Sequence, residues 1–272
     1  MPFYLNNTNV QEISEMIYEA SSTVADAYAT SDDDTIGYYT VSPEQIASAL
    51  GQFVDVMHMI ENAETCTDLF TEHATNPPAD WDVVLSDSDQ PSLNPDDISE
   101  IGNYALDLIE TLSDWARNLK LSREEHQLQA VMVVIALWIA RHGGSLSSIE
   151  TVTDTLSTIA NNTTDSSALI ELSHIMGELM AAVATETKRD FQQGIASKVW
   201  RTLHVNQGIV ATRSHDPVLM ESVFDQLALN IPEAAPLFFE EGMHQVIALE
   251  YPPAVREVMD RYYKRYTMRV VH

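Results

Sequence analysis

Positive charge is absent from the first 116 residues of this chain. The first Lys or Arg is Arg117, whereas the stretch before it contains 23 Asp and Glu residues. The whole chain has a formal net charge of −27, and residues 117–272 hold all 14 basic residues. Such a surface repels phosphate groups, which argues against direct binding of nucleic acid or of anionic membranes and favours a basic protein partner. Solubility is the competing explanation of the same charge.

Cysteine and glycine are also scarce. The single cysteine, Cys66, cannot form an intramolecular disulfide, which fits a reducing compartment. The nine glycines form no glycine-rich phosphate loop, and neither a Cys/His zinc spacing nor a nucleophile elbow is present. We therefore expect no cofactor and favour a protein without enzymatic activity.

Long apolar runs are missing as well. The longest, at 130–140, has eleven residues, about half of what a membrane-spanning helix requires. The first residues, MPFYLNNTNVQEIS, contain neither the basic nor the apolar segment of a secretory signal. The sequence therefore predicts a soluble, cytoplasmic protein without a membrane partner.

Helical periodicity runs along most of the chain, punctuated by capping signals. The start signals are Ser42 with Gln45, Asn94 with Asp97, Ser122 with Glu125, Ser147 with Glu150, and Asp216 with Pro217. The stop signals are Gly143 with Gly144, and Gly208. The pattern predicts helices at roughly 8–29, 43–72, 95–120, 122–142, 148–160, 165–187, 188–207, 217–230, 233–250 and 253–268. The segment WDVVL at 81–85 is a short strand candidate.

We expect an all-α fold, an orthogonal or antiparallel bundle of about nine to ten helices without a significant sheet. An acidic N-terminal helical region, residues 1–94, would end in a long irregular loop at 73–94. Residues 95–272 would form the main helical bundle, and one continuous domain is the alternative. The second half of helix 122–142 is apolar on nearly every side, which places Ile135 and Trp138 in a core.

Three acid–histidine doublets have the i, i+3 spacing with which di-iron proteins bind metal from facing helices. They are Asp55 with His58, Glu171 with His174, and Glu241 with His244. At 100° per residue each doublet points away from the apolar stripe of its helix, which for 233–250 includes Val246 and Ile247. We therefore interpret them as surface pairs and assign no metal ligands.

The densest polar cluster of the less acidic half lies in a predicted loop at 206–217 and on the helix before it. Its residues form a candidate site for an anionic ligand or an acidic partner segment: Trp200, His204, Arg213, His215 and Asp216. A His-Asp dyad in an all-helical protein also suggests a metal-dependent hydrolase. His174 or His204 would then be the metal ligand that precedes the dyad in the sequence, and Asp225 or Asp260 would be the ligand that follows it. Against this hypothesis, Pro217 makes Asp216 an ordinary helix N-cap.

The last helix is amphipathic and rich in tyrosine and in basic residues. We expect it to pack on an acidic surface, either its own or that of a second copy, and a homodimer is the default assembly. The leading interpretation is a non-enzymatic acidic interaction or regulatory protein that binds a basic partner through its Lys- and Arg-free N-terminal region. The alternatives are the metal-dependent hydrolase and a helical protein that binds a small ligand.

Overall fold

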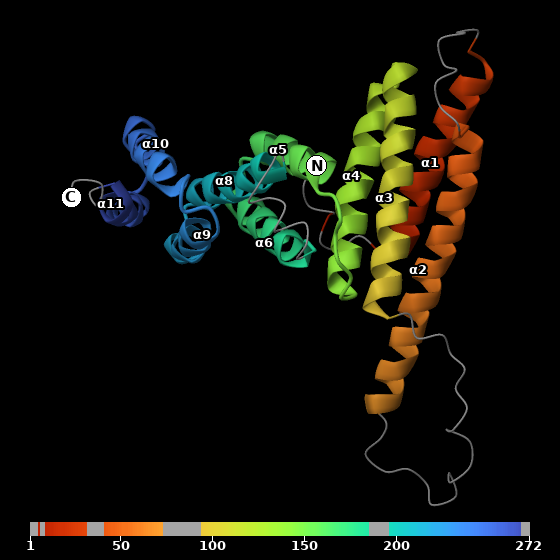
Figure 1. Cartoon of the computed structure of the whole chain (residues 1–272), viewed down its shortest axis with the longest axis horizontal. Coiled ribbons are helices and arrows are strands. Elements are labelled where there is room, and N and C mark those ends of the chain that lie inside the picture. Colours follow the sequence, from red (N-terminus) through yellow and green to blue (C-terminus); the bar gives the residue numbers. More distant parts are fainter. Residues whose placement is uncertain (1–4, 6–8, 32–40, 73–93, 185–195, 268–272) are drawn as a thin grey trace, which may run out of the picture. The chain divides into compact units, whose positions relative to one another are not determined.

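The computed structural model describes residues 5, 9–31, 41–72, 94–184 and 196–267, and these form ten helices (Figure 1). The helices are α1 (Val10–Ala29), α2 (Pro43–Glu72), α3 (Pro95–Asn118), α4 (Ser122–Arg141), α5 (Glu150–Asn162), α6 (Ser166–Ala182), α8 (Ala196–Ser214), α9 (Pro217–Asn230), α10 (Ala235–Ala248) and α11 (Pro253–Thr267). Within these described ranges there is no strand, only an isolated bridge between Leu146 and Val183. The predicted all-α fold is confirmed.

Several sequence-based expectations concern other parts of the chain. The strand candidate at 81–85, residues 73–93 of the irregular loop, and residues 32–40 lie outside the described residues. None of the helices described here combines the length and the apolar character needed to cross a bilayer.

The helices pack as two compact units. The N-terminal unit contains residues 8–135 and 142–144, and the C-terminal unit contains residues 1–7, 136–141 and 145–272. The chain passes from one unit to the other within α4. The division between residues 94 and 95 that we expected from the sequence stays a prediction.

The N-terminal unit consists of long helices that lie side by side in alternating directions (Figure 1). Predicted capping boxes start two of them. At α2, Ser42 and Gln45 exchange side-chain and backbone hydrogen bonds of 3.0 and 3.4 Å. At α3, Asn94 and Asp97 do the same. These bonds satisfy amide groups that a helix start leaves without a partner.

The core of this unit comes from one apolar stripe on each helix. Fully buried members include Ile13, Ile46, Leu50, Met57, Ile109 and Leu112. Tyr28 of α1 packs edge-on against Trp115 of α3, with ring centroids 4.9 Å apart. The side chain of Gln127 in α4 donates a 3.0 Å hydrogen bond to the backbone of Met16 in α1. In α4, residues 131–135 of this unit are buried, and burial continues along the helix to residue 139, as predicted for its apolar second half.

The C-terminal unit combines α5, α6 and α8 with an aromatic core formed by α9, α10 and α11. The rings of Phe224, Phe238, Phe239 and Tyr262 meet mostly edge to face, at centroid distances of 5.2–5.6 Å. Edge contacts of this kind suit the charge distribution of aromatic rings. Six helices were predicted after residue 148, and six are described in this unit, whereas residues 188–195 of the predicted helix 188–207 lie outside the described residues.

The largest error of the sequence-based helix assignment lies around α8. We predicted a helix ending near Gly208 and a loop at 206–217, whereas α8 continues through Gly208 to Ser214. The helix α6 ends at Ala182 and not at 187. Gly208 is therefore not a stop signal. Packing explains the glycine instead, because a Cβ atom there would lie 2.5 Å from Cζ of Phe238. The glycine allows close helix packing and does not end the helix.

Two smaller predictions were also wrong. Ser147 does not cap α5, which begins at Glu150 with Ile149 at the N-cap and no side-chain cap bond. Ile149 is only 3% exposed, so burial of an apolar residue outweighs capping at this end. Ile247, which we assigned to the apolar stripe of its helix, is 55% exposed, whereas Val246 is buried.

Candidate functional site

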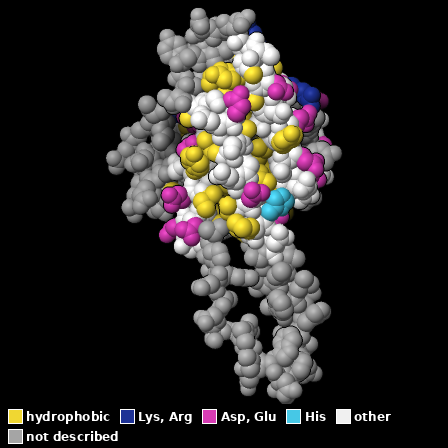
Figure 2. Space-filling view, turned by 90° about the vertical axis from the view of Figure 1, so that its right-hand side faces the viewer, with side chains coloured by type: hydrophobic (Ala, Val, Ile, Leu, Met, Phe, Trp, Pro, Cys, Tyr) yellow, Lys and Arg dark blue, Asp and Glu magenta, His cyan; other side chains and the backbone are white. Residues whose placement is uncertain are grey.

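The exposed face of α1 and α2 contains an open groove of about 600 Å³. Small residues of both helices line it, together with the carboxylates of Glu44 and Asp55 and the ring of Tyr18. With a rise of 1.5 Å per residue, Glu44 and Asp55 stand about 16 Å apart along α2. Figure 2 views this side of α1 and α2 and shows acidic side chains spread among apolar ones, with few Lys or Arg side chains. The groove is therefore an acidic surface with an apolar component.

Two residues of the groove have no evident role in the packing of the unit. The side chain of Tyr18 is 75% exposed, although it is aromatic. A Cβ atom built on Gly51 would meet no atom within 4 Å. A glycine in the middle of a helix costs about 1 kcal/mol relative to alanine. The fold thus does not require glycine at position 51, and the groove is open at this point.

The Lys and Arg residues of the N-terminal unit all lie near the junction of α3 and α4, and most of them form ion pairs there. Arg117 binds Asp114 at 2.6 Å and Glu125 at 2.8 Å. Arg123 binds Glu19 of α1 at 2.8 Å. Pairs as exposed as these add little stability, about 0–1 kcal/mol. Their main consequence is that these cations do not neutralise the groove.

The carboxylates of the groove keep their charge available. Within the described part of the chain, Glu44 and Asp55 form no ion pair. Crowding of acids is visible elsewhere in the same unit, where partial burial and the neighbouring Glu110 raise the pKa of Asp107. A basic group that approached this unit would relieve repulsion between carboxylates.

The residues of the candidate site predicted at 200–216 do not form one cluster. His204 is only 2% exposed, and its ring packs edge-on against Trp200 at 4.6 Å. Trp200 is half-buried against the aromatic core of α9–α11. His215 directly follows α8 and comes eleven residues after His204. At a rise of 1.5 Å per residue, the two positions are about 16 Å apart along the helix axis. These two histidines therefore do not converge on a common ion.

Arg213, His215 and Asp216 build the junction between α8 and α9. The guanidinium of Arg213 donates hydrogen bonds to the backbone carbonyls of Ala160, at 2.7 Å, and Thr163, at 2.5 Å. It thereby satisfies carbonyl groups at the end of α5. His215 has a left-handed φ of 61°. Asp216 accepts the amides of two residues in the first turn of α9, the N-cap that Pro217 predicted.

The three acid–histidine doublets lie at the surface, as expected. None of their six side chains is buried; His58 and Glu171 are half-buried and the others are exposed. In the described ranges, no three His, Cys, Asp or Glu side chains are grouped so that they could hold a metal ion.

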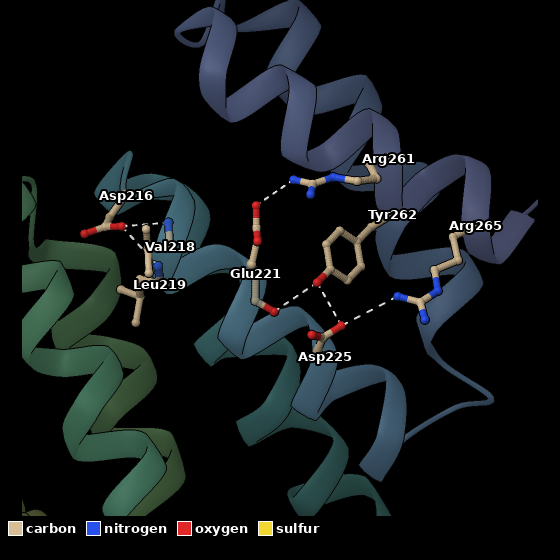
Figure 3. Close-up of polar contacts among 8 residues, drawn as sticks. All are labelled: Asp216, Val218, Leu219, Glu221, Asp225, Arg261, Tyr262 and Arg265. Carbon is tan, nitrogen blue, oxygen red and sulfur yellow. Dashed lines mark hydrogen bonds and ion pairs between the residues drawn. The ribbon is translucent and has the colours of Figure 1, made fainter.

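The basic helix α11 packs on an acidic surface of its own chain. Arg261 binds Glu221 of α9 at 2.6 Å, and Arg265 lies 3.8 Å from Asp225 (Figure 3). The hydroxyl of Tyr262 donates to Asp225 at 2.8 Å and to the backbone carbonyl of Glu221 at 3.1 Å. Burial, followed by these acidic neighbours, raises the pKa of Tyr262. The sequence suggested two acidic surfaces for this helix, one on its own chain and one on a second copy. In the structure α11 contacts the surface of its own chain.

The α1–α2 groove was not predicted, although the sequence contains two signals of it. Gly51 stands in the middle of a predicted 30-residue helix, where glycine is unfavourable. Tyr18 gave a weaker signal, since it lies off the buried stripe of α1.

Comparison with known proteins adds no relationship. No protein-family model, no curated protein and no solved structure matches the chain. The groove and the charge around it are therefore the features from which a function can be inferred.

Proposed function

We propose that this protein is a non-enzymatic interaction or regulatory protein that binds a basic partner protein through its N-terminal region, residues 1–116. The observation that carries the proposal is the groove between α1 and α2. It is open, it is lined by two carboxylates without an ion pair among the described residues, and it belongs to a stretch without Lys or Arg.

The groove favours a basic helical segment as the bound element. Small residues on both walls let a helix approach closely, and Gly51 leaves room for a side chain of the partner. Glu44 and Asp55 would pair with two cations about 16 Å apart, which corresponds to three helical turns. Tyr18 offers an exposed aromatic ring, a side chain that often contributes strongly to protein interfaces.

A defined peptide tests the proposal. We would titrate the full chain with a synthetic helix that carries two lysines eleven residues apart and alanine or leucine between them, and measure affinity by calorimetry at low and high salt. The double variant E44Q/D55Q should weaken binding by about fivefold for each carboxylate, the upper end for exposed ion pairs. Affinity should also fall steeply as salt rises.

The matched control is E15Q/E100Q, which removes the same charge from exposed positions of the same unit outside the groove. It should leave the affinity nearly unchanged. Equal losses in both double variants would mean that the peptide senses only net charge, and the groove would be rejected.

A second variant tests the groove by shape. Gly51→Leu should be tolerated by the fold, because no atom lies within 4 Å of the added Cβ. The leucine side chain would occupy the groove and abolish peptide binding while the helical circular dichroism stays unchanged. Full binding by a folded Gly51→Leu protein would contradict the proposed site.

A further inference from the structure

The C-terminal unit contains a separate pocket of about 650 Å³ between α8 and α10. Its volume lies within the range of about 300–1,000 Å³ that is typical of small-ligand sites. The walls are mainly apolar, with Ile209 of α8 and Leu249 after α10 at 44% and 59% exposure. The pocket therefore presents apolar surface that the described residues do not cover.

Close helix packing builds the floor of the pocket. A Cβ atom on Gly242 would lie 2.7 Å from Cε of Met259, so the end of the Met259 side chain from α11 packs directly against α10 at this glycine. Phe238 and Tyr251 add two aromatic rings to the lining. His215, one of the residues singled out from the sequence, packs edge-on against Tyr251, with ring centroids 4.8 Å apart.

The polar groups of the pocket lining differ in whether they already form hydrogen bonds within the protein. On α8, Thr212 donates its hydroxyl to the backbone of Gly208, and Arg213 donates to carbonyls at the end of α5. On α10, the side chains of Glu241, His244 and Gln245 line the same pocket. Throughout the described ranges, Glu241 forms no hydrogen bond or ion pair. The carboxyl group of Glu241, without a partner among the described residues, thus lies beside aromatic and thioether surface.

We propose that this pocket binds a small apolar ligand that carries a single ammonium group, with the ammonium at Glu241 and the apolar body on Phe238, Tyr251 and Met259. The carboxylate of Glu241 and the side-chain amide oxygen of Gln245 would accept hydrogen bonds from the ammonium N–H groups. Aromatic faces attract cations, and the net charge of −27 raises the local concentration of cations around the protein.

A carboxylate ligand on Arg213 is the opposite choice, and the contacts favour it less. The Arg213 guanidinium is turned towards two backbone carbonyls at the negative end of the α5 dipole, which already compensate part of its charge. An anionic ligand would also meet Glu241 and the negative field of the whole chain.

Three probes of equal chain length test the proposal: octylammonium, octanoate and octanol. Binding to the full chain would be followed by calorimetry and by the NMR signals of methionine methyl groups, which include Met259. We expect octylammonium to bind at least about fivefold more tightly than octanol, as a single exposed ion pair allows, and octanoate to bind most weakly. Tighter binding of octanoate, or equal binding of all three probes, would overturn the assignment of an ammonium ligand.

Two variants distinguish binding at Glu241 in the pocket from attraction to the net charge of the protein. Glu241→Gln should reduce the affinity for octylammonium by roughly fivefold and leave octanol unchanged. The control Glu240→Gln removes the same charge from the adjacent exposed residue, which does not line the pocket, and should change neither affinity. Equal effects of both variants would contradict the proposal.

A third variant tests location without changing charge. Ile209→Trp places a larger side chain at the mouth of the pocket, at a position that is partly exposed and therefore accommodates it. It should abolish binding of both octylammonium and octanol, whereas a variant that folds and binds both probes fully would place them elsewhere. Because none of these residues belongs to the α1–α2 groove, the result is independent of the peptide experiment.

Discussion

At the scale of single residues, two helical glycines show that the surroundings decide whether an added methyl group would fit. Gly51 and Gly208 both lie inside helices. An added Cβ at Gly51 meets empty space, but at Gly208 it would meet Cζ of Phe238 at 2.5 Å and Cδ1 of Leu227 at 3.1 Å. Phe238 is buried and Leu227 is fully enclosed, so neither can move away freely.

We therefore expect opposite effects from one substitution. Gly51→Ala should stabilise the protein by about 1 kcal/mol through helix propensity. Gly208→Ala gains the same propensity but should be destabilised overall, because overpacking a core costs about 1–3 kcal/mol. Denaturant unfolding of both variants measures the difference, and each serves as the control for the other. Stabilisation of both variants would show that Phe238 adjusts without cost.

At the scale of elements, α11 is attached to the rest of the C-terminal unit by two different kinds of contact. Val255, Val258, Met259 and Tyr262 are buried in the core of the C-terminal unit. The ion pairs of Arg261 and Arg265 lie at its exposed edge. Burial of the apolar side supplies most of the attachment, since exposed pairs contribute about 0–1 kcal/mol each.

The Tyr262 hydroxyl is the polar contact that should matter most for this attachment. Tyr262→Phe keeps the buried ring but removes the bonds to Asp225 and to the Glu221 carbonyl. We expect a loss of about 1 kcal/mol in unfolding free energy, the net value of a typical hydrogen bond. The control is Tyr263→Phe, a half-buried neighbour, which should have little effect. Similar losses in both variants would argue against a specific role for the Tyr262 hydroxyl.

The same residue predicts a dependence on pH. Folding raises the pKa of Tyr262 because burial, and then Asp225, disfavour the phenolate. A group whose pKa is raised on folding contributes stability below its unfolded pKa, about 10 for tyrosine. Above that pH the unfolded chain releases a proton that the folded chain retains, and the contribution is lost progressively.

The difference in stability between wild type and Tyr262→Phe should therefore be constant from pH 7 to 9 and shrink above about pH 10. Urea unfolding at several pH values measures it. A difference that stays constant up to pH 11 would show that Tyr262 ionises equally in both states.

At the scale of the whole molecule, the uneven charge is the dominant property. Repulsion among the 23 acids of residues 1–116 has no Lys or Arg of the same stretch to offset it. Screening should relieve this repulsion, because the Debye length falls from about 30 Å at 0.01 M salt to about 10 Å at 0.1 M. Salt should therefore stabilise this protein.

We expect the midpoint of thermal unfolding to rise between 0.01 and 0.3 M NaCl. Each 1 kcal/mol of relieved repulsion corresponds to about 2–4 °C for a chain of this size. Sucrose at matched osmolality is the control that separates screening from solute exclusion. A midpoint that falls with salt would mean that the ion pairs of Arg117, Arg123 and Arg261 outweigh the repulsion.

Local signals in the sequence were sufficient for most helices. The capping boxes at Ser42 and Asn94, the Asp216–Pro217 start and the stop at Gly143 all depend on neighbours within a few residues. The outward position of the acid–histidine doublets follows from the same helical period. A single sequence contains this information because the interactions that cause it are local.

By itself, the sequence determined the all-α class, the buried second half of α4 and the acidic character of the N-terminal region. Only the tertiary structure decided that α8 continues past Gly208, that Arg213 caps α5, and that His204 and His215 stay apart. It also decided where the α1–α2 groove and the α8–α10 pocket open. These features arise from contacts between residues far apart in the chain, such as Gly208 with Phe238 and Gly242 with Met259. Helical periodicity describes one helix at a time, so it carries no information about which surfaces meet or which remain uncovered.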